Sequence, residues 1–443
     1  GRNDYSSTLP LGKNSYFYPS AMLSFIATDY LKTRDIDTGV LDFAKFRISY
    51  GRTGKDASLY AVYDRLVAAE ITNPGYPSID NLSFPLGGIN SYTVSNTAGN
   101  INLAPELTDE FEVGTDLAFF DHRIGLEFSY YNKFTKGLIA TLPIDPSTGY
   151  TAQIANLGDV KNQGIEMLIN FVPIKTNDFT WDVSYNFTKN YNKVESLDVP
   201  EVFLGGYGGI GIYAVEGEPI GQFKSQKALK VMVDGVESTV VDGNGNPQPT
   251  PDDVFLGKDI NEKYRMGLTN TFTYKGISLS GTFDYRYGGY IYSYTKDYMH
   301  WVGSGPETVY NDRNPFIIPN SVIDNGDGTY SENTTPVNPT ALHTFYSNGG
   351  FDYTDFAVID RSYLKLRNVS LAYQLPQRFA NSLKVNSVRA SFTASNILLW
   401  TPVENQYIDP EITTFGNNIA ARFGEFGTTP PYQTYVFGLS ISF

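Results

Sequence analysis

The last ten residues, Thr434–Phe443, alternate apolar and polar side chains with a period of two. Because successive side chains of a strand point to opposite faces, this pattern predicts a strand with one apolar face. Similar alternation begins near Arg123, Trp181, Tyr264 and Ile277. Each segment runs about ten residues, which is the span of a tilted strand through a bilayer and exceeds the usual soluble strand. Tyr and Phe gather at the segment ends, as in the aromatic girdles of membrane barrels.

Eleven such strands are expected, and their connections alternate between short and long. This alternation is typical of outer-membrane barrels, which have short periplasmic turns and long external loops. We therefore predict an all-β fold, a transmembrane antiparallel β-barrel whose last strand ends in the periplasm. The expected strands span about 16–27, 41–53, 109–120, 123–135, 163–172, 179–190, 264–274, 277–288, 362–375, 387–399 and 434–443. The short connections are 121–122, 173–178, 275–276 and 376–386, 28–40 is moderate, and the long ones are 54–108, 138–162, 191–263, 289–361 and 400–433.

The odd strand count predicts that the barrel does not close within this chain. A single-chain barrel normally has an even number of strands and begins with an outward one, whereas segment 16–27 would run inward. We therefore expect at least one further strand before Gly1, and no pairing between segments 16–27 and 434–443. No signal peptide is readable at Gly1–Asp4, so the chain is either mature or lacks its front, and the strand count favours the second.

The composition supports strands and excludes several classes of protein. The 443 residues include 33 Tyr, 29 Phe and 41 Gly, and only 18% are charged, against about 25% in a typical soluble domain. There is no Cys, which excludes disulfides, thiolate zinc sites and Cys nucleophiles. The net charge of −14 gives no basic footprint for nucleic acid. No apolar run reaches the length of a transmembrane helix.

Six segments, in chain order, match the motifs of one family. They are Lys45–Gly54 (KFRISYGRTG), Leu107–Gly114 (LTDEFEVG), Asn156–Glu166 (NLGDVKNQGIE), Ser362–Gln374 (SYLKLRNVSLAYQ), Ser395–Trp400 and the closing Thr434–Phe443 (TYVFGLSISF). They resemble the LRASYGxTG, ExTxxxExG, NxGxVxNxGxE, SFLRLKNxxLGY, QNLFTWT and TYTFGLNLTF segments of SusC/RagA-type TonB-dependent transporters of Bacteroidetes. Together they span nearly the whole chain, which makes the resemblance specific.

The resemblance implies a twenty-two-stranded barrel around an N-terminal plug. Residues 1–443 would be its C-terminal half, without the plug, the TonB box or the first half of the barrel. It also implies import of an oligomeric nutrient, a glycan or a peptide, with a SusD-like surface lipoprotein outside and TonB acting on the plug from the periplasm. Outer-membrane lipid surrounds such a barrel, and the barrel assembly machinery reads its terminal aromatic residue, here Phe443. No cofactor is implied.

Two glycine-rich stretches imitate nucleotide-binding motifs. Gly206–Gly211 matches GxGxxG, but no helix is readable after it, so we interpret it as a flexible external loop. Gly51–Asp56 ends like a phosphate loop, yet Ser49 stands where the first Gly belongs and Asp56 replaces the hydroxyl residue. Neither stretch predicts a nucleotide site.

Nothing in the sequence predicts catalysis. The three histidines, His122, His300 and His343, have no ligand spacing, and His122 falls in a short periplasmic turn. There is no G-x-S-x-G elbow and no distinguished pair of carboxylates. We therefore expect that the protein is not an enzyme.

One segment partly resembles a calcium loop. Asp242, Asn244 and Asn246 alternate as EF-hand ligands do, and Asp253 stands at position twelve. Pro247 replaces the required Gly at position six, and position twelve should be Glu, so a turn is the main expectation and calcium the lesser one. No other metal site is predicted, and Asp324–Gly328 is read as a plain turn.

Aromatic residues in the long loops are the candidates for contact with a substrate, because ring faces stack on sugars and pack on peptides. The structural alternative is that they form the interfacial girdle and pack the loops. The candidate substrate-binding residues are Tyr290, Tyr298, Trp301, Trp400 and Tyr407.

Two rival functions remain open at this stage. A SusC-like barrel can serve as a structural or assembly partner in a larger outer-membrane complex, and an intact plug and TonB box would argue for import instead. A soluble carbohydrate-binding sandwich would dissolve without detergent, but the alternating connections and the terminal Phe443 argue against it.

Overall fold

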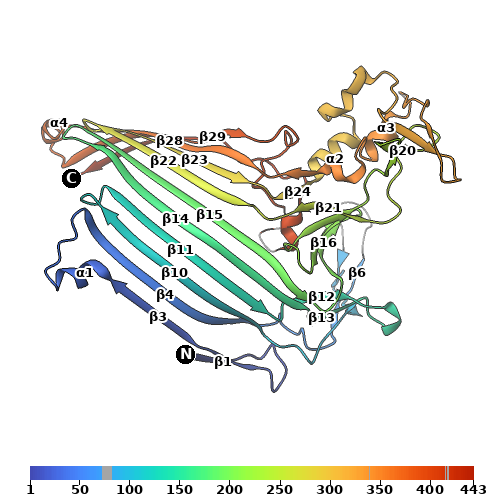
Figure 1. Ribbon diagram of the computed structural model, residues 1–443, viewed down its shortest axis with the longest axis horizontal. Helices are drawn as coiled ribbons and strands as arrows, with labels where there is room; N and C mark the ends of the chain where they lie inside the picture. Colours follow the sequence, from blue (N-terminus) through green and yellow to red (C-terminus); the bar gives the residue numbers. More distant parts are fainter. Residues whose placement is uncertain (72–81, 339, 415, 417–418) are drawn as a thin grey trace.

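Eleven antiparallel strands form one curved sheet in the computed structural model, and each pairs with the next along the chain (Figure 1). All eleven predicted strands are present, which confirms the sequence pattern. They are β3 (Ser20–Ile26), β4 (Leu41–Lys55), β10 (Glu106–Phe119), β11 (Ile124–Lys136), β14 (Gly158–Lys175), β15 (Phe179–Leu197), β22 (Tyr264–Tyr274), β23 (Ile277–Tyr287), β28 (Tyr363–Gln374), β29 (Ser387–Trp400) and β31 (Thr434–Ser442). The structure describes residues 1–71, 82–338, 340–414, 416 and 419–443.

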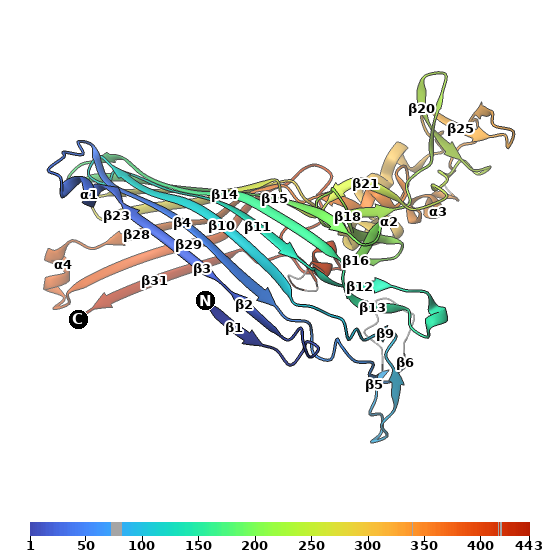
Figure 2. The same ribbon diagram turned by 60° about the horizontal axis from the view of Figure 1, so that its bottom comes forward.

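The sheet bends into an open trough, which Figure 2 shows from a second side. Its two edges are β3 and β31, and within the described residues these edges do not pair with each other. This confirms the expectation that the chain does not close a barrel by itself.

The first predicted strand, 16–27, was wrong at both ends. Pro19 has no N–H and divides the segment into β2 (Ser15–Tyr18) and β3, although its carbonyl still accepts a hydrogen bond from the amide of Arg52 (3.0 Å). β2 instead pairs with β1 (Arg2–Tyr5) as a separate hairpin. At the other end, Ala27–Lys32 forms the helix α1 rather than strand and turn.

Other boundaries also moved. β14 and β15 have 18 and 19 residues, so the predicted spans 163–172 and 179–190 covered only part of each. Since about ten residues cross a bilayer, this pair is long enough to extend beyond it. The short connection 376–386 also contains a helical turn, α4 (Gln377–Ser382).

The long connections fold into small sheets and helices at the end of the trough opposite the short turns (Figure 1). We call the described residues between β15 and β22, between β23 and β28, and between β29 and β31 the head. Its strands are β16 (Glu201–Tyr207), β17 (Ile210–Val215), β18 (Gln222–Ser225), β19 (Lys230–Val233), β20 (Val236–Val241), β21 (Val254–Asp259), β24 (Tyr290–Ser293), β25 (Ser321–Asp324), β26 (Tyr330–Glu332), β27 (Val358–Asp360) and β30 (Gly424–Glu425). Its helices are α2 (Tyr294–Trp301), α3 (Leu342–Ser347), η3 (Pro306–Arg313), η4 (Tyr353–Ala357) and η5 (Ala420–Phe423).

The connections between β4 and β10 and between β11 and β14 contain short strands and one short helix in their described residues. They contain β5 (Leu66–Ala68), β6 (Glu70–Ile71), β7 (Leu82–Ser83), β8 (Tyr92–Val94), β9 (Thr97–Ala98), β12 (Ile139–Pro143), β13 (Ala152–Asn156) and η2 (Pro146–Thr148).

Parallel pairing ties the head together. β20 pairs with β25, and β24 pairs with β30, so that residues from all three connections share sheets. The largest apolar core lies here as well. It joins Ile212 and Phe223 of the first connection to Tyr292 and Val358 of the second and Phe423 of the third. The sequence predicted the length of these connections but not that they fold together.

The outer face of the trough is apolar and exposed. Across seven neighbouring strands, one row of residues paired in register consists of large apolar side chains alone. If the sheet spans a bilayer, this row belongs to the apolar belt that contacts lipid. Leu279, Phe283, Phe437 and Leu439, which the sequence assigns to this face, are 44%, 37%, 82% and 68% exposed. The row consists of Ile174, Trp181, Phe272, Leu279, Leu371, Phe392 and Phe437. Among the described helices, none has both the length and the apolarity to cross a membrane.

Candidate functional site

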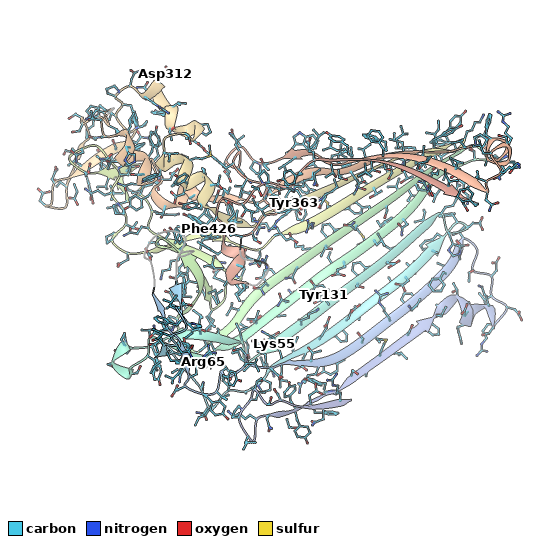
Figure 3. All side chains as sticks on the ribbon, turned by 180° about the vertical axis from the view of Figure 1, so that it is seen from behind. Lys55, Arg65, Tyr131, Asp312, Tyr363 and Phe426 are labelled. Atoms are coloured by element: carbon cyan, nitrogen blue, oxygen red, sulfur yellow. The ribbon has the colours of Figure 1, made fainter. Side chains whose placement is uncertain are left out.

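A network of charged side chains lines the concave face where the trough meets the head. Tyr363, Lys365 and Arg367 occupy alternate positions at the start of β28, opposite in facing to the apolar side chains of the outer belt. Figure 3 shows Tyr363 at this junction. The Lys365 ammonium lies 2.6 Å from both Asp409 and Glu411, which belong to the connection after β29.

The network extends to the neighbouring strands. Arg265 of β22 contacts Asp284 of β23 at 3.2 Å and Glu411 at 2.8 Å. Arg367 pairs with the same two carboxylates, and the Tyr363 hydroxyl donates to Glu411 at 2.8 Å. Burial alone would raise the pKa of Glu411, but hydrogen bonds from Arg367, Lys365 and Tyr363 outweigh burial and lower it well below its ordinary value.

These contacts give the network a structural role, which is to attach the connection after β29 to the sheet, rather than a catalytic one. Its carboxylates are already shared among cations, so no acid or base is poised to exchange a proton. The segment around Asp409 and Glu411 is thereby held against the wall of the trough, at the mouth beneath the head.

A row of aromatic rings runs through the head and joins all three connections. Adjacent ring centroids lie 5.2 to 5.8 Å apart throughout the row. Tyr298 and Trp301 are about half exposed, at 48% and 49%, so part of each ring is open to contact from outside. In order, the aromatic row consists of Tyr207, Phe426, Tyr294, Tyr298, Trp301 and His343. Figure 3 marks Phe426 beside the mouth.

Two of the five predicted contact residues, Tyr298 and Trp301, lie in this row. At its far end is a cavity of about 310 Å³, lined by Trp301 and His343 together with Arg313, His300 and Tyr346 among others. A cavity of this size holds a small molecule or one unit of a larger one.

The other three predicted residues are dispersed. Tyr290 lies in β24 with the Lys258 ammonium over its ring at 5.5 Å. Tyr407 lines a second cavity of about 410 Å³ beside Lys365 and Asp409. Trp400 pairs in register with Leu364 on the outer face of the sheet, a position that suits the aromatic girdle and removes it from the candidate site.

Tyr407 belongs to a partly buried polar cluster that the sequence did not indicate. Its hydroxyl donates to Glu307, whose carboxylate lies 3.7 Å from Nε2 of His300 and 4.0 Å from the Lys296 ammonium. Burial lowers the pKa of His300 and of Lys296. His300 Nδ1 lies 3.0 Å from the Lys296 carbonyl, a helical contact that keeps the ring in place. The cluster packs η3 against α2 and the last connection.

The possible calcium residues form a turn. One carboxylate oxygen of Asp242 accepts hydrogen bonds from the amides of Asn244 (2.8 Å) and Asn246 (2.9 Å). Asp253 instead lines a hollow beside the β16–β17 hairpin. Within the described ranges, no three His, Cys, Asp or Glu side chains are grouped as metal ligands.

The glycine-rich Gly206–Gly211 was expected to be a flexible loop and is a β-hairpin. Its turn, Gly208-Gly209, joins β16 to β17, and both glycines have positive φ. This geometry excludes the strand-to-helix turn of a dinucleotide site.

Signals for some of the missed residues were present. Tyr294, which was not a candidate, lies four residues before Tyr298 and seven before Trp301, a spacing that places it on one helix face with these two predicted residues. Tyr363, Lys365 and Arg367 are spaced by two within an apolar strand. No local signal links Tyr207 or Phe426 to this face, because each comes from another connection.

The comparison with known families agrees with this architecture. The family model described as TonB dependent receptor-like, beta-barrel matches residues 1–397. The chain belongs to the TonB-dependent receptor β-barrel family. Its members are outer-membrane β-barrels, and this barrel is of the SusC/RagA type.

Curated relatives of this TonB-dependent receptor barrel are similar over nearly its whole length. The TonB-dependent receptor P3 of Formosa agariphila is 28% identical over 473 residues, covering 100% of the chain and 43% of that receptor. The TonB-dependent receptor SusC of Bacteroides thetaiotaomicron is 25% identical and covers 92% of the chain and 38% of SusC. The chain thus spans less than half the length of these relatives.

A solved structure has the same fold. The RagAB peptide transporter superposes with a TM-score of 0.72 at 20% identity, over 100% of the chain and 45% of the transporter chain. At that identity the likeness concerns the fold alone. The chain therefore superposes on less than half of that transporter chain.

Proposed function

We propose that the whole protein imports an oligomeric nutrient, a glycan or a peptide, across the outer membrane, and that it does so by transport without covalent chemistry. The observation that carries the proposal is the membership of residues 1–397 in the TonB-dependent receptor barrel family. The apolar outer belt and the charged inner wall support it, since a barrel conducting polar cargo needs both. The long connections then lie outside the cell and the C-terminus in the periplasm.

The partners follow from the same resemblance. A SusD-like lipoprotein would cap the mouth from outside, and TonB would act from the periplasm on a plug that residues 1–443 do not include. The similar structure of RagAB is that of a peptide transporter, and SusC is a TonB-dependent receptor. Outer-membrane lipid and the barrel assembly machinery complete the expected set.

Substrate contact is assigned to the aromatic row, with Tyr298 and Trp301 as its most exposed members. Rings that are half exposed and lie beside a cavity offer stacking surface to sugars or to apolar peptide side chains. Tyr290 and Tyr407, which are engaged by Lys258 and Glu307, would act indirectly by shaping the head.

The experiment is uptake by cells that carry the full-length protein as their single copy. Growth is measured on a panel of oligosaccharides and of peptides as limiting nutrients, with a deletion strain as the baseline. Trp301→Ala should slow growth on the one nutrient that needs the transporter. Trp400→Ala is the matched control, because Trp400 is equally exposed (47%) but lies on the outer face.

Two results would count against the proposal. Growth of the deletion strain on every nutrient at the wild-type rate would remove the import function. Loss of growth with Trp400→Ala but not with Trp301→Ala would leave import intact and move the contact site away from the aromatic row.

The alternative is a structural or assembly role in a larger outer-membrane complex. It predicts co-purification with stable partners and a deletion strain that loses those partners from the membrane while still taking up every nutrient. The exposed aromatic row could contact a nutrient or a partner protein. The uptake assay therefore separates the two functions.

A further inference from the structure

One cavity in the head is lined by a permanent positive charge. It is the cavity of about 310 Å³ at the end of the aromatic row, with walls from α2, η3 and α3. Among the described residues that line it, Arg313 keeps its charge at any physiological pH, whereas burial lowers the pKa of His300. None of these lining residues is Asp or Glu, although the whole chain has 47 acidic residues against 33 Lys and Arg. The cavity is therefore basic within an acidic protein.

The guanidinium of Arg313 is held in place without being neutralised. Its Nη2 donates to the carbonyl of Gly303 at 2.8 Å, and its Nε donates to the carbonyl of Thr308 at 3.3 Å. Within the described ranges, no carboxylate lies within ion-pair distance of this group. A guanidinium has five N–H donors, so about three remain for a ligand. Because Arg313 is an exposed residue, a ligand can reach it from outside.

The backbone that carries Arg313 has an uncommon conformation. Asn311, Asp312 and Arg313 have φ of +50°, +51° and +62°, in the left-handed region that residues other than glycine rarely adopt. Asn and Asp tolerate this region better than other side chains do, whereas Arg has no such preference. The side-chain amide of Asn311 donates to the carbonyl of Pro315 at 3.0 Å and bridges the turn. Backbone strain of this kind is concentrated at ligand-binding sites, where it positions a side chain.

Trp301 presents a flat apolar surface to the same cavity. Its ring is 49% exposed, stacks on Tyr298 at 5.7 Å and meets the edge of His343 at 5.7 Å, so neighbours hold it in place. The carbonyl that accepts from Arg313 belongs to Gly303, two residues after Trp301. A ring face and a cation in one cavity suit a ligand unit with a flat body and an anionic group.

We propose that this cavity binds a uronic-acid unit of an acidic glycan, with the carboxylate on the guanidinium of Arg313 and the sugar ring against Trp301. A guanidinium pairs with a carboxylate through two parallel N–H···O bonds. In a uronic acid the carboxylate is attached directly to the sugar ring, so a single unit meets both groups in a cavity of this size. An acidic peptide side chain brings the carboxylate on a flexible stem without a ring, which favours the sugar. The inference rests on the proposed import function and narrows its cargo to acidic glycans.

The experiment is calorimetric titration of the purified full-length protein in detergent. The probes are short oligomers of galacturonate, glucuronate and mannuronate, each paired with its uncharged methyl ester. At least one acid should bind roughly tenfold more tightly than its ester, since hydrogen bonds to a charged group contribute that factor or more. Arg313→Gln should remove the difference and leave binding of the ester unchanged. The control is Arg378→Gln, on the exposed surface of α4 at the opposite end of the trough, which should leave both affinities unchanged.

Several outcomes would overturn the proposal. One is equal affinity for acid and ester in every pair, and another is a preference for the acid that survives in Arg313→Gln. Equal weakening of acid and ester in Arg313→Gln would show that Arg313 only supports the fold of the head. Tighter binding of a blocked glutamyl peptide than of any uronate would overturn the assignment to a sugar.

Failure of this inference can be told apart from failure of import. A deletion strain that loses growth only on a neutral glycan or on a peptide would keep import and remove the uronate site. A deletion strain that grows normally on every nutrient, with acid-specific binding still dependent on Arg313, would keep the site and remove import.

Discussion

The ammonium of Lys365 on β28 lies 2.6 Å from the carboxylate of Asp409, and both side chains are 6% exposed. The two residues are 44 positions apart, and the pair fastens the connection after β29 to the wall of the trough. Ion pairs at protein surfaces contribute little to folding stability. Removing one partner of a buried pair, however, strongly destabilises the protein.

Lys365→Met should therefore loosen the connection after β29, because it leaves Asp409 buried without its closest cation. The expected cost is about 3–5 kcal/mol. Limited proteolysis would show it as faster cleavage within residues 401–433. Lys175→Met, at the exposed end of β14, is the control. Replacing both partners in Lys365→Met/Asp409→Met should recover part of the resistance, and equal cleavage of all variants would contradict the fastening.

The same connection should be sensitive to acid. The folded pKa of Glu411 lies below its ordinary value of 4.5. A carboxyl group of this kind contributes stability above its unfolded pKa, and that contribution is lost as the pH falls through the folded pKa. We expect full attachment at neutral pH and progressive weakening below about pH 4.5. The thermal unfolding temperature, followed by tryptophan fluorescence, should fall as the pH is lowered. It should fall less steeply in Glu411→Gln than in the unsubstituted protein. Parallel curves for the two proteins would be inconsistent with this role.

Phe283→Arg should impair folding into lipid more than Thr282→Arg. Phe283 faces outward opposite Leu268, whereas the Thr282 hydroxyl lies 3.0 Å from that of Thr269 on the inner face. Arginine on the lipid side costs about 2–4 kcal/mol at the midplane and less near an interface. The fraction folded in phospholipid vesicles measures the difference. Equal tolerance of both substitutions would refute the assignment of faces.

The orientation of the barrel can be tested by labelling, since the chain has no Cys of its own. Lys275 lies in the tight turn between β22 and β23, and Trp301 lies in the head at the opposite end (Figure 1). In intact cells, a membrane-impermeant maleimide should label Trp301→Cys and should not label Lys275→Cys. The reverse pattern would invert the topology.

Deletion of Phe443 should lower insertion into the outer membrane, because the assembly machinery reads a terminal aromatic residue in barrels that this one resembles. Phe443 is 88% exposed after the end of β31. Tyr432→Ala in the preceding connection is a suitable control, since Tyr432 is similarly exposed at 79%. Surface levels are compared by quantitative blotting of outer-membrane fractions. A similar loss in the two variants would argue against a signal at Phe443.

The trough was predictable from sequence because its signal is local. Each strand carries its own alternation, and a short turn such as Lys275-Gly276 sets the register of the pair around it. The errors fall where a local feature interrupts a strand, as at Pro19, or where pairing continues beyond the bilayer, as in β14 and β15. Alternation alone does not mark where the lipid ends.

The head was not predictable in the same way. β20 and β25 are short and pair in parallel across about eighty residues of chain, and nothing local fixes such a register. The aromatic row likewise takes Tyr207, Tyr294 and Phe426 from three connections. Of the five candidate residues, Tyr298 and Trp301 came together because one short helix carries both.

The shared core of the head also constrains how such receptors can diversify. Ile212, Tyr292 and Phe423 come from three different connections and pack into one cluster. A recombination event that exchanged a single connection would leave the other two facing side chains of the wrong shape. The three connections should therefore be inherited, or grafted in the laboratory, as one set, with the trough as an interchangeable base.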